Sequence, residues 1–284
     1  MNIHINIKSQ AGMSVIELMI AMTLSVILMT GVIQIFVSTK QSYTTTDNIS
    51  RAQESGRFAI DVLSRYARIG GYWDYDTPLL DDTPTPFATR CGILVDAPCS
   101  QDGNGKNDSD NRNNSDRLAV QFASSDNLNI DCNGETPSAN RVFLNVFWVQ
   151  DDDFDVPSLF CQGYDSSTGN WLGEAKPYIS GIDSMQILYG IQDDNGSVTH
   201  YVNAARMNND FDDDGDGNIT DPGEFDWFDV RAVRITVLAQ SGLDEDANYD
   251  DRTYVLLDSE PLLFNDGQPR YIFSTTLYLS NTEA

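Results

Sequence analysis

Basic residues and histidine are scarce in this sequence. Of 284 residues, 17 are Lys or Arg and two are His, against 43 Asp and Glu, so the net charge is −26. Nucleic-acid binding needs cationic patches that displace counterions, and the acidic balance argues against that class. No G-x-S-x-G, P-loop, H-E-x-x-H or dinucleotide fingerprint occurs, so no motif supports an enzyme. Paired acids of the glycosidase kind stay open only because acids are so abundant.

Cysteine is also rare, and its spacing excludes the common zinc and redox motifs. The four cysteines form no C-x-x-C pair, so zinc ribbons and thioredoxin-like chemistry lack support. An even number in an exported domain predicts two disulfides, with three possible connectivities. We favour Cys91–Cys99 and Cys132–Cys161, because near neighbours in sequence close short loops. The alternative is four buried thiols.

One apolar run stands near the N-terminus. Residues 13–37 read MSVIELMIAMTLSVILMTGVIQIFV, with Glu17 and Gln34 as the strongly polar exceptions. As a helix this run is about 37 Å long, enough to cross a bilayer core. No good small-x-small cleavage site follows it, unlike an ordinary secretory signal. Lys8 on the preceding flank places residues 1–12 in the cytoplasm by the positive-inside rule.

The helical pattern continues beyond the apolar run. Apolar residues recur at spacings of three and four as far as Ile69, with charged residues between them, and Gly70-Gly71 is a stop signal. The sequence therefore predicts one helix from about Ser14 to Ile69. The part of the chain up to Trp73 holds six of the basic residues and only four of the acidic ones, so nearly all the negative charge follows it.

The acidic part of the chain has strand-like segments separated by polar loops. Asn195-Gly196 predicts a hairpin with a two-residue turn, and residues 101–116 form a low-complexity polar loop. The predicted class is α+β, with a long N-terminal helix packed by its rear half on an antiparallel β-sheet with extended loops. The expected strands are 117–123, 141–150, 179–191, 198–204, 229–239, 252–257 and 270–279.

The N-terminal run resembles the class III signal of type IV prepilins. The pattern is Gly12, then a hydrophobic residue, then a Glu five residues on, in an uncharged apolar stretch. The resemblance implies that a prepilin peptidase cuts after Gly12 and methylates the new N-terminus at Met13. It also implies that Glu17 acts in subunit docking. The family usually has Phe at the first mature position, and Met13 departs from that.

Later blocks resemble PilW-type minor pilins. They are QSYTTTDNISRAQESGRFAIDVLSRYARIGGYWD after the apolar run, and then NSDRLAVQF, FCQG, PYISGIDSMQILYGI, WFDVRAVRITVLAQS and RYIFSTTLYLSN in order. The resemblance covers nearly the whole chain. It divides the chain into a cleaved leader at 1–12, a helix at 13–70 and an acidic β-rich body at 71–284.

The resemblance implies a structural protein, not an enzyme. A PilW-type minor pilin primes assembly of the type IV pilus and sits near its tip, with other minor pilins, the major pilin, a tip adhesin and the inner-membrane assembly platform as partners. It would span the inner membrane with its body in the periplasm, and then join the pilus at the cell surface. A J-type minor pseudopilin of type II secretion is the nearest alternative. A membrane-anchored extracytoplasmic hydrolase or calcium-dependent binding module is a more distant one.

Glu17 has a physical reason to act in docking. A carboxylate in lipid is costly, and we expect this one to be unpaired in the monomer. Cleavage after Gly12 creates an α-amino group on Met13, which in a helix bundle could pair with Glu17 of a neighbouring subunit. A buried ion pair adds little stability but fixes register.

One acidic loop has the spacing of a calcium site. Residues 209–226 read NDFDDDGDGNITDPGEFD, which fits a DxDxDG loop with Gly217 at the sharp turn. The closing acid is out of place, because position 12 is Gly223 and Glu224 comes one residue late. A second register from Asp210 to Asp221 is open, and so is a solvated loop without metal. The candidate ligands are Asp212, Asp214, Asp216, Asn218, Thr220 and Glu224.

Calcium binding is directly measurable. If the carboxylates of residues 209–226 converge on Ca²⁺, titration of the soluble body (residues 42–284) releases heat and raises its melting temperature, because a ligand that binds only the folded state stabilises it. Isothermal calorimetry and thermal unfolding check this. No heat and no thermal shift at millimolar calcium would exclude the site.

Overall fold

The structure is a computed structural model that describes most of the chain. The described residues are 12–72, 85–87, 100–103, 114–123, 130–137, 142–166, 168–193, 195–207, 227–241, 252–266 and 268–280. They fall into two compact units, residues 1–47 and 48–284. Helix α1 (Val15–Ile69) contributes its front part to the first unit and its rear part to the second. The predicted single helix is thus confirmed.

The second unit is built from two four-stranded antiparallel sheets. One sheet has the strand order β1-β2-β3-β4 and the other has the order β10-β7-β5-β6, with a small two-stranded sheet of β8 and β9 beside them. The remaining elements are the short helix α2 (Ala204–Met207) and the 3-10 turn η2 (Trp227–Asp229). The strands are β1 (Leu118–Ala123), β2 (Val142–Asp151), β3 (Pro157–Asp165), β4 (Asn170–Ser180), β5 (Ile182–Gln192), β6 (Val198–Val202), β7 (Val230–Gln240), β8 (Thr253–Tyr254), β9 (Leu262–Leu263) and β10 (Arg270–Tyr278).

The α+β class is confirmed, but the expectation of one sheet is wrong. The sequence pattern missed β3 and most of β4, which complete the first sheet. β3 begins with Pro157, and β4 is exposed along most of its length and contains Gly173 and Pro177, so neither shows clear apolar alternation. The pattern also merged the end of β4 with β5, because a single residue, Gly181, separates them.

Gly181 is the point where the chain leaves one sheet for the other. Its φ of +83° is in the left-handed region that favours glycine. Its N–H donates to the carbonyl oxygen of Pro157 at 2.8 Å, and its own carbonyl accepts the N–H of Gln240 at 2.9 Å. The backbone is therefore hydrogen-bonded to both sheets at this one residue.

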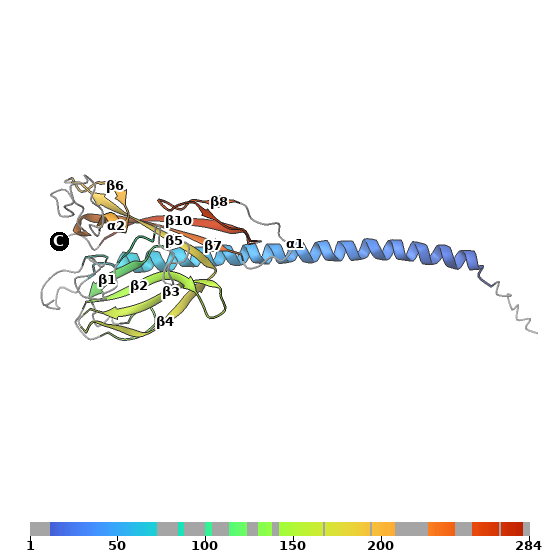
Figure 1. The fold of residues 1–284 in the computed structure, drawn as a ribbon, viewed down its shortest axis with the longest axis horizontal. Coiled ribbons are helices and arrows are strands. Elements are labelled where there is room, and N and C mark those ends of the chain that lie inside the picture. Colours follow the sequence, from blue (N-terminus) through green and yellow to red (C-terminus); the bar gives the residue numbers. More distant parts are fainter. Residues whose placement is uncertain are drawn as a thin grey trace, which may run out of the picture. The chain divides into compact units, whose positions relative to one another are not determined.

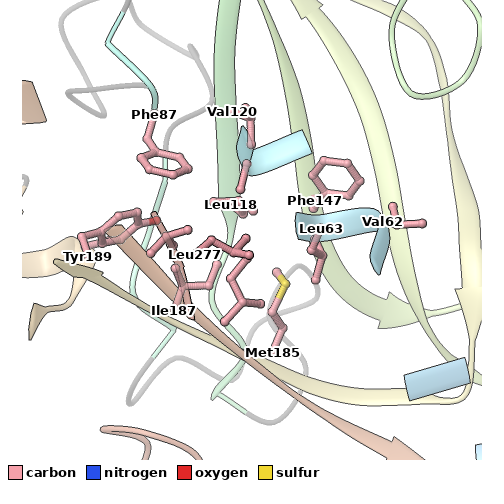
Figure 2. Packing of buried hydrophobic residues seen from close by; sticks show 14 of the residues in the cluster. Val62, Leu63, Phe87, Leu118, Val120, Phe147, Met185, Ile187, Tyr189 and Leu277 are labelled. Atoms are coloured by element: carbon pink, nitrogen blue, oxygen red, sulfur yellow. The ribbon is translucent and has the colours of Figure 1, made fainter. Parts of the chain in front are cut away.

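The rear part of α1 lies between the two sheets (Figure 1). Its buried face consists of small and medium side chains, which let the backbone approach the strands closely: Ala52, Gly56, Ala59, Val62, Leu63 and Ala67. In Figure 2, Val62 and Leu63 lie among side chains of β1, β2, β5 and β10. One hydrophobic core therefore joins the helix to both sheets.

Buried polar groups reinforce the connection between the sheets. Asp116, just before β1, is 2% exposed and accepts the N–H of Gly103 at 2.9 Å and that of Ile187 in β5 at 2.7 Å. Burial raises the pKa of the Asp116 carboxyl well above its ordinary value, and these two N–H donors act in the opposite direction. Ser115 also binds β5, accepting the N–H of Met185 at 2.9 Å.

The disulfide Cys132–Cys161 is confirmed. It joins the segment before β2 to β3, with the two Cα atoms 6.3 Å apart. The Asp131 carboxylate accepts the N–H groups of Asn133, Glu135 and Gly163 and so orders the backbone beside it. The other predicted disulfide, Cys91–Cys99, lies outside the described residues.

The hairpin predicted at Asn195-Gly196 connects β5 and β6. Asp193 and Ser197 close it through an N–H to carbonyl bond of 2.9 Å, which leaves three residues in the loop and not the two expected. Gly196 has a φ of +76°. The Asp193 carboxylate also accepts the N–H groups of Asn195 and Ser197, and these bonds lower the pKa of Asp193. The sequence therefore predicted the position of the turn correctly, but the number of residues in its loop was wrong.

Gly56 lies against the ring of Phe273 in β10, with no room for a side chain of its own. A Cβ atom there would lie 2.2 Å from Cδ2 of Phe273 in β10. We expect Gly56→Leu to lower the free energy of unfolding of the body by about 2 kcal/mol, because overpacking displaces the ring. Urea unfolding of residues 42–284 measures this.

Two further variants distinguish a clash with Phe273 from a general effect of leucine on the stability of the helix. Gly56→Leu combined with Phe273→Ala should recover at least half of the loss, because the side chain then has room. Gln53→Leu, on an exposed position of α1, should change stability by less than about 0.5 kcal/mol. A Gly56→Leu variant as stable as the unaltered chain would contradict the close contact.

Candidate functional site

The N-terminal end of α1 brings the predicted processing and docking residues together. Gly12 and Met13 directly precede the helix, which begins at Val15. Ser14 is the capping residue, and its hydroxyl oxygen accepts the N–H of Ile16 at 3.3 Å. Glu17 reaches back, and its Oε2 accepts the N–H of Ser14 at 3.2 Å. These two bonds form a variant of the capping box, in which the hydroxyl accepts from N2 and not from N3, and they satisfy N–H groups that have no partner inside the helix.

In the part of the chain that the structure describes, Glu17 has a hydrogen-bond partner but no cationic one. The carboxylate accepts a backbone hydrogen bond, although no ion pair to it exists among the described residues. Its position also suits the positive end of the helix dipole. The sequence contained the signal for this role, since Ser14-x-x-Glu17 ahead of an apolar run is the capping-box pattern.

The front part of α1 is predominantly apolar on all sides. Its most hydropathic 18-residue window has a mean hydropathy of 2.2, and none of that window is buried within the protein. By length and composition this helix suffices to cross a membrane. We find no other such helix in the part of the chain that the structure describes.

Hydroxyl groups within this apolar stretch are satisfied inside the helix. Thr23, Ser25 and Thr30 each donate to the carbonyl oxygen four residues earlier, at 3.1, 2.7 and 2.8 Å. Backbone and side-chain polar groups in lipid must find partners within the protein. These side chains therefore add little to the cost of placing the helix in a bilayer.

The other predicted site stays a prediction. The calcium loop, residues 209–226, lies outside the described residues, including all six candidate ligands. Among the described residues, no group of three or more His, Cys, Asp or Glu side chains is arranged to hold a metal ion.

Two segments of the chain match models of known protein families. Residues 146–281 match the family model of the type IV pilus-assembly protein W, PilW. Residues 7–33 match the prokaryotic N-terminal methylation motif, which spans the predicted cleavage point and Glu17. A comparison with curated proteins finds no match.

A solved structure shows a weak likeness. The type IV-like pilin TTHA1219 from Thermus thermophilus aligns with 82% of this chain and 98% of its own, at 14% identity and a TM-score of 0.40. Likeness of this degree says nothing about what the present chain does.

The capping box predicts a local effect of Ser14. Ser14→Ala removes the hydroxyl acceptor, and loss of such a cap costs about 1 kcal/mol of helix stability. We expect amide hydrogen exchange in the first turn to accelerate about fivefold, measured on the full chain in detergent micelles. Ser25→Ala, which alters a hydroxyl farther along the helix, should leave the first turn unchanged. Equal exchange in Ser14→Ala and the unaltered chain would contradict the cap.

Proposed function

Since this chain is a PilW-like type IV minor pilin, a structural protein and not an enzyme, we propose that it helps to prime pilus assembly and is then incorporated near the pilus tip. The observation that carries the proposal is the combination of the N-terminal methylation motif, on a helix whose front part is long and apolar enough to cross a membrane, with the match of residues 146–281 to the PilW family. The helix anchors the chain in the membrane, and the same helix can pack against other pilins once it leaves the bilayer.

The proposed order of events follows from the chemistry of the N-terminus. The prepilin peptidase cuts after Gly12 in the inner membrane, and the body lies in the periplasm. Helix-to-helix packing then replaces contacts with lipid as the chain enters the filament, where bundles are stabilised by close packing. Other minor pilins, the major pilin, a tip adhesin and the assembly platform are the proposed partners.

Glu17 would have two successive tasks in this scheme. In the monomer its carboxylate caps α1 through the N–H of Ser14. In the filament it pairs with the α-amino group of Met13 on a neighbouring subunit and fixes axial register, because an unpaired charge in an apolar bundle is strongly unfavourable. We also propose that the loop at residues 209–226 binds Ca²⁺, on the evidence of its ligand spacing.

Deletion of the gene distinguishes this function from its nearest alternative. We expect loss of surface pili, counted by electron microscopy, with type II secretion intact. Loss of secretion with normal pili would instead indicate a J-type pseudopilin. Mass spectrometry of the processed chain should find N-methylated Met13 as the first residue, and any other N-terminus would contradict processing after Gly12.

Two substitutions separate the two tasks of Glu17. Glu17→Ala should leave processing largely intact but lower incorporation into sheared pili roughly tenfold or more, because the ion pair is lost. Glu17→Gln keeps an acceptor for the Ser14 N–H but removes the charge, so it should fail in incorporation as Glu17→Ala does. Normal incorporation of Glu17→Gln, with loss of incorporation in Glu17→Ala, would show that the cap and not the ion pair matters.

A further inference from the structure

A groove runs along the junction of α1 and β10 in the second unit. It has a volume of about 660 Å³ and is lined by one exposed stripe of the helix and the middle of the strand. The lining side chains that matter here are Arg57, Ser64 and Arg65 from α1, and Thr275 from β10.

β10 is an edge strand, and its outer edge has no strand beside it in the described part of the chain. It pairs with β7 through all nine of its residues. Such an edge presents a row of backbone N–H and C=O groups that can pair with another chain. A further strand would lie about 4.8 Å beyond β10, and so above the stripe of α1 that lines the groove.

The two long edge strands differ in how they are protected. β4, at the edge of the other sheet, contains Lys176 and Pro177, which are devices that prevent strand addition. Between its ends β10 reads YIFSTTL, with neither proline nor a charged residue. Of these two long edge strands, the one beside the groove is therefore the one that can accept another strand.

The groove lining is net positive in an acidic protein, with Arg57, Arg65 and Arg68 against the single acid Asp61. Arg57 is exposed and makes no ion pair among the described residues, and Arg65 pairs only with Asp61 at 3.3 Å, with both side chains about 70% exposed (72% and 67%). The chain as a whole carries a net charge of −26. Exposed pairs of this kind add little stability, so the arginines are available for a partner.

We propose that this groove is a docking site for an acidic, extended segment of a neighbouring pilin subunit. The segment would add to the β10 edge as a fifth strand of that sheet, and its carboxylates would lie over Arg57 and Arg65. Main-chain bonds would supply affinity, and the arginines would supply charge selectivity. The inference rests on the proposed function for the identity of the partner and adds the surface and chemistry of contact.

Photo-crosslinking in piliated cells tests the docking site on the full chain. p-Benzoylphenylalanine is placed at Thr275 or at Ser64, which approach the groove from the strand and from the helix, and at Trp171 on β4 as the control. We expect crosslinks from Thr275 and Ser64 to an acidic segment of another pilin, mapped by mass spectrometry, at least fivefold above those from Trp171. Equal yields at Trp171, or crosslinks only within the same chain, would overturn the proposal.

Charge reversal gives an independent readout. Arg57→Glu should reduce the Thr275 crosslink at least fivefold. Lys176→Glu makes the same charge change on β4, away from the groove, and should leave the crosslink unchanged. Melting temperatures equal to that of the unaltered chain would show that neither variant is misfolded. A Thr275 crosslink that is insensitive to Arg57→Glu, or directed to a basic segment, would overturn the proposal.

Failure of this inference and failure of the proposed function give different results. If the deletion strain lacks pili but Thr275 and Ser64 give no intermolecular crosslink, the groove is not the docking site and the assembly role stands. If the deletion strain assembles normal pili, the assembly role itself is wrong.

Discussion

The structure of the body depends on the close contact between the small-residue face of α1 and the strands on both sides of it. Gly56, Ala59 and Ala67 bring the helix backbone near the sheets, and Leu63 fills the space between them. A larger residue at Gly56 would meet Phe273 at once. One core serves both sheets, and the small-residue face of the helix is part of that core.

The same helix changes its chemistry along its length. Its front part is predominantly apolar on all sides and satisfies its hydroxyl groups internally. Its rear part has a buried stripe of small residues and an exposed stripe that includes Arg57 and Arg65. The first composition suits lipid or a helix bundle, and the second suits a globular core with a basic outer face.

One local sequence pattern at the N-terminus is compatible with two roles of the same residue, Glu17. Glu17 in an apolar run indicated a docking charge, and the structure adds that it caps the helix through Ser14. The two meanings are compatible, because a carboxylate that caps the first turn lies near the chain terminus that processing would create. What the motif could not show was the hydrogen bond, which follows from the position at which the helix begins.

The groove beside β10 and the protected edge of β4 show how the body distinguishes its two sheet edges. β4 carries Lys176 and Pro177, whereas β10 has a polar but uncharged middle next to exposed arginines. In an acidic protein, that arrangement concentrates positive charge at the edge where another strand has room to pair.

Much of the fold was predictable where the signal is local. The periodic helix pattern, the stop at Gly70-Gly71, the strands β1, β2, β5, β7 and β10, and the turn at Gly196 all follow from residues close together in sequence. β3 and β4 were missed because their stability comes from neighbours: β3 is held between β2 and β4, and β4 pairs with β3 alone. Cys132–Cys161 was favoured by proximity in sequence, and its geometry depends on β3 lying beside β2.

The sequence by itself determined the membrane-length helix, the N-terminal methylation motif over residues 7–33, and the separation of an acidic body from a near-neutral helix. Each of these depends on composition or on spacings within a few turns. Only the tertiary structure decided that the strands form two sheets, that Gly181 links them, and that β10 is an edge facing Arg57 and Arg65. These depend on contacts between segments far apart in the chain, which no local pattern encodes.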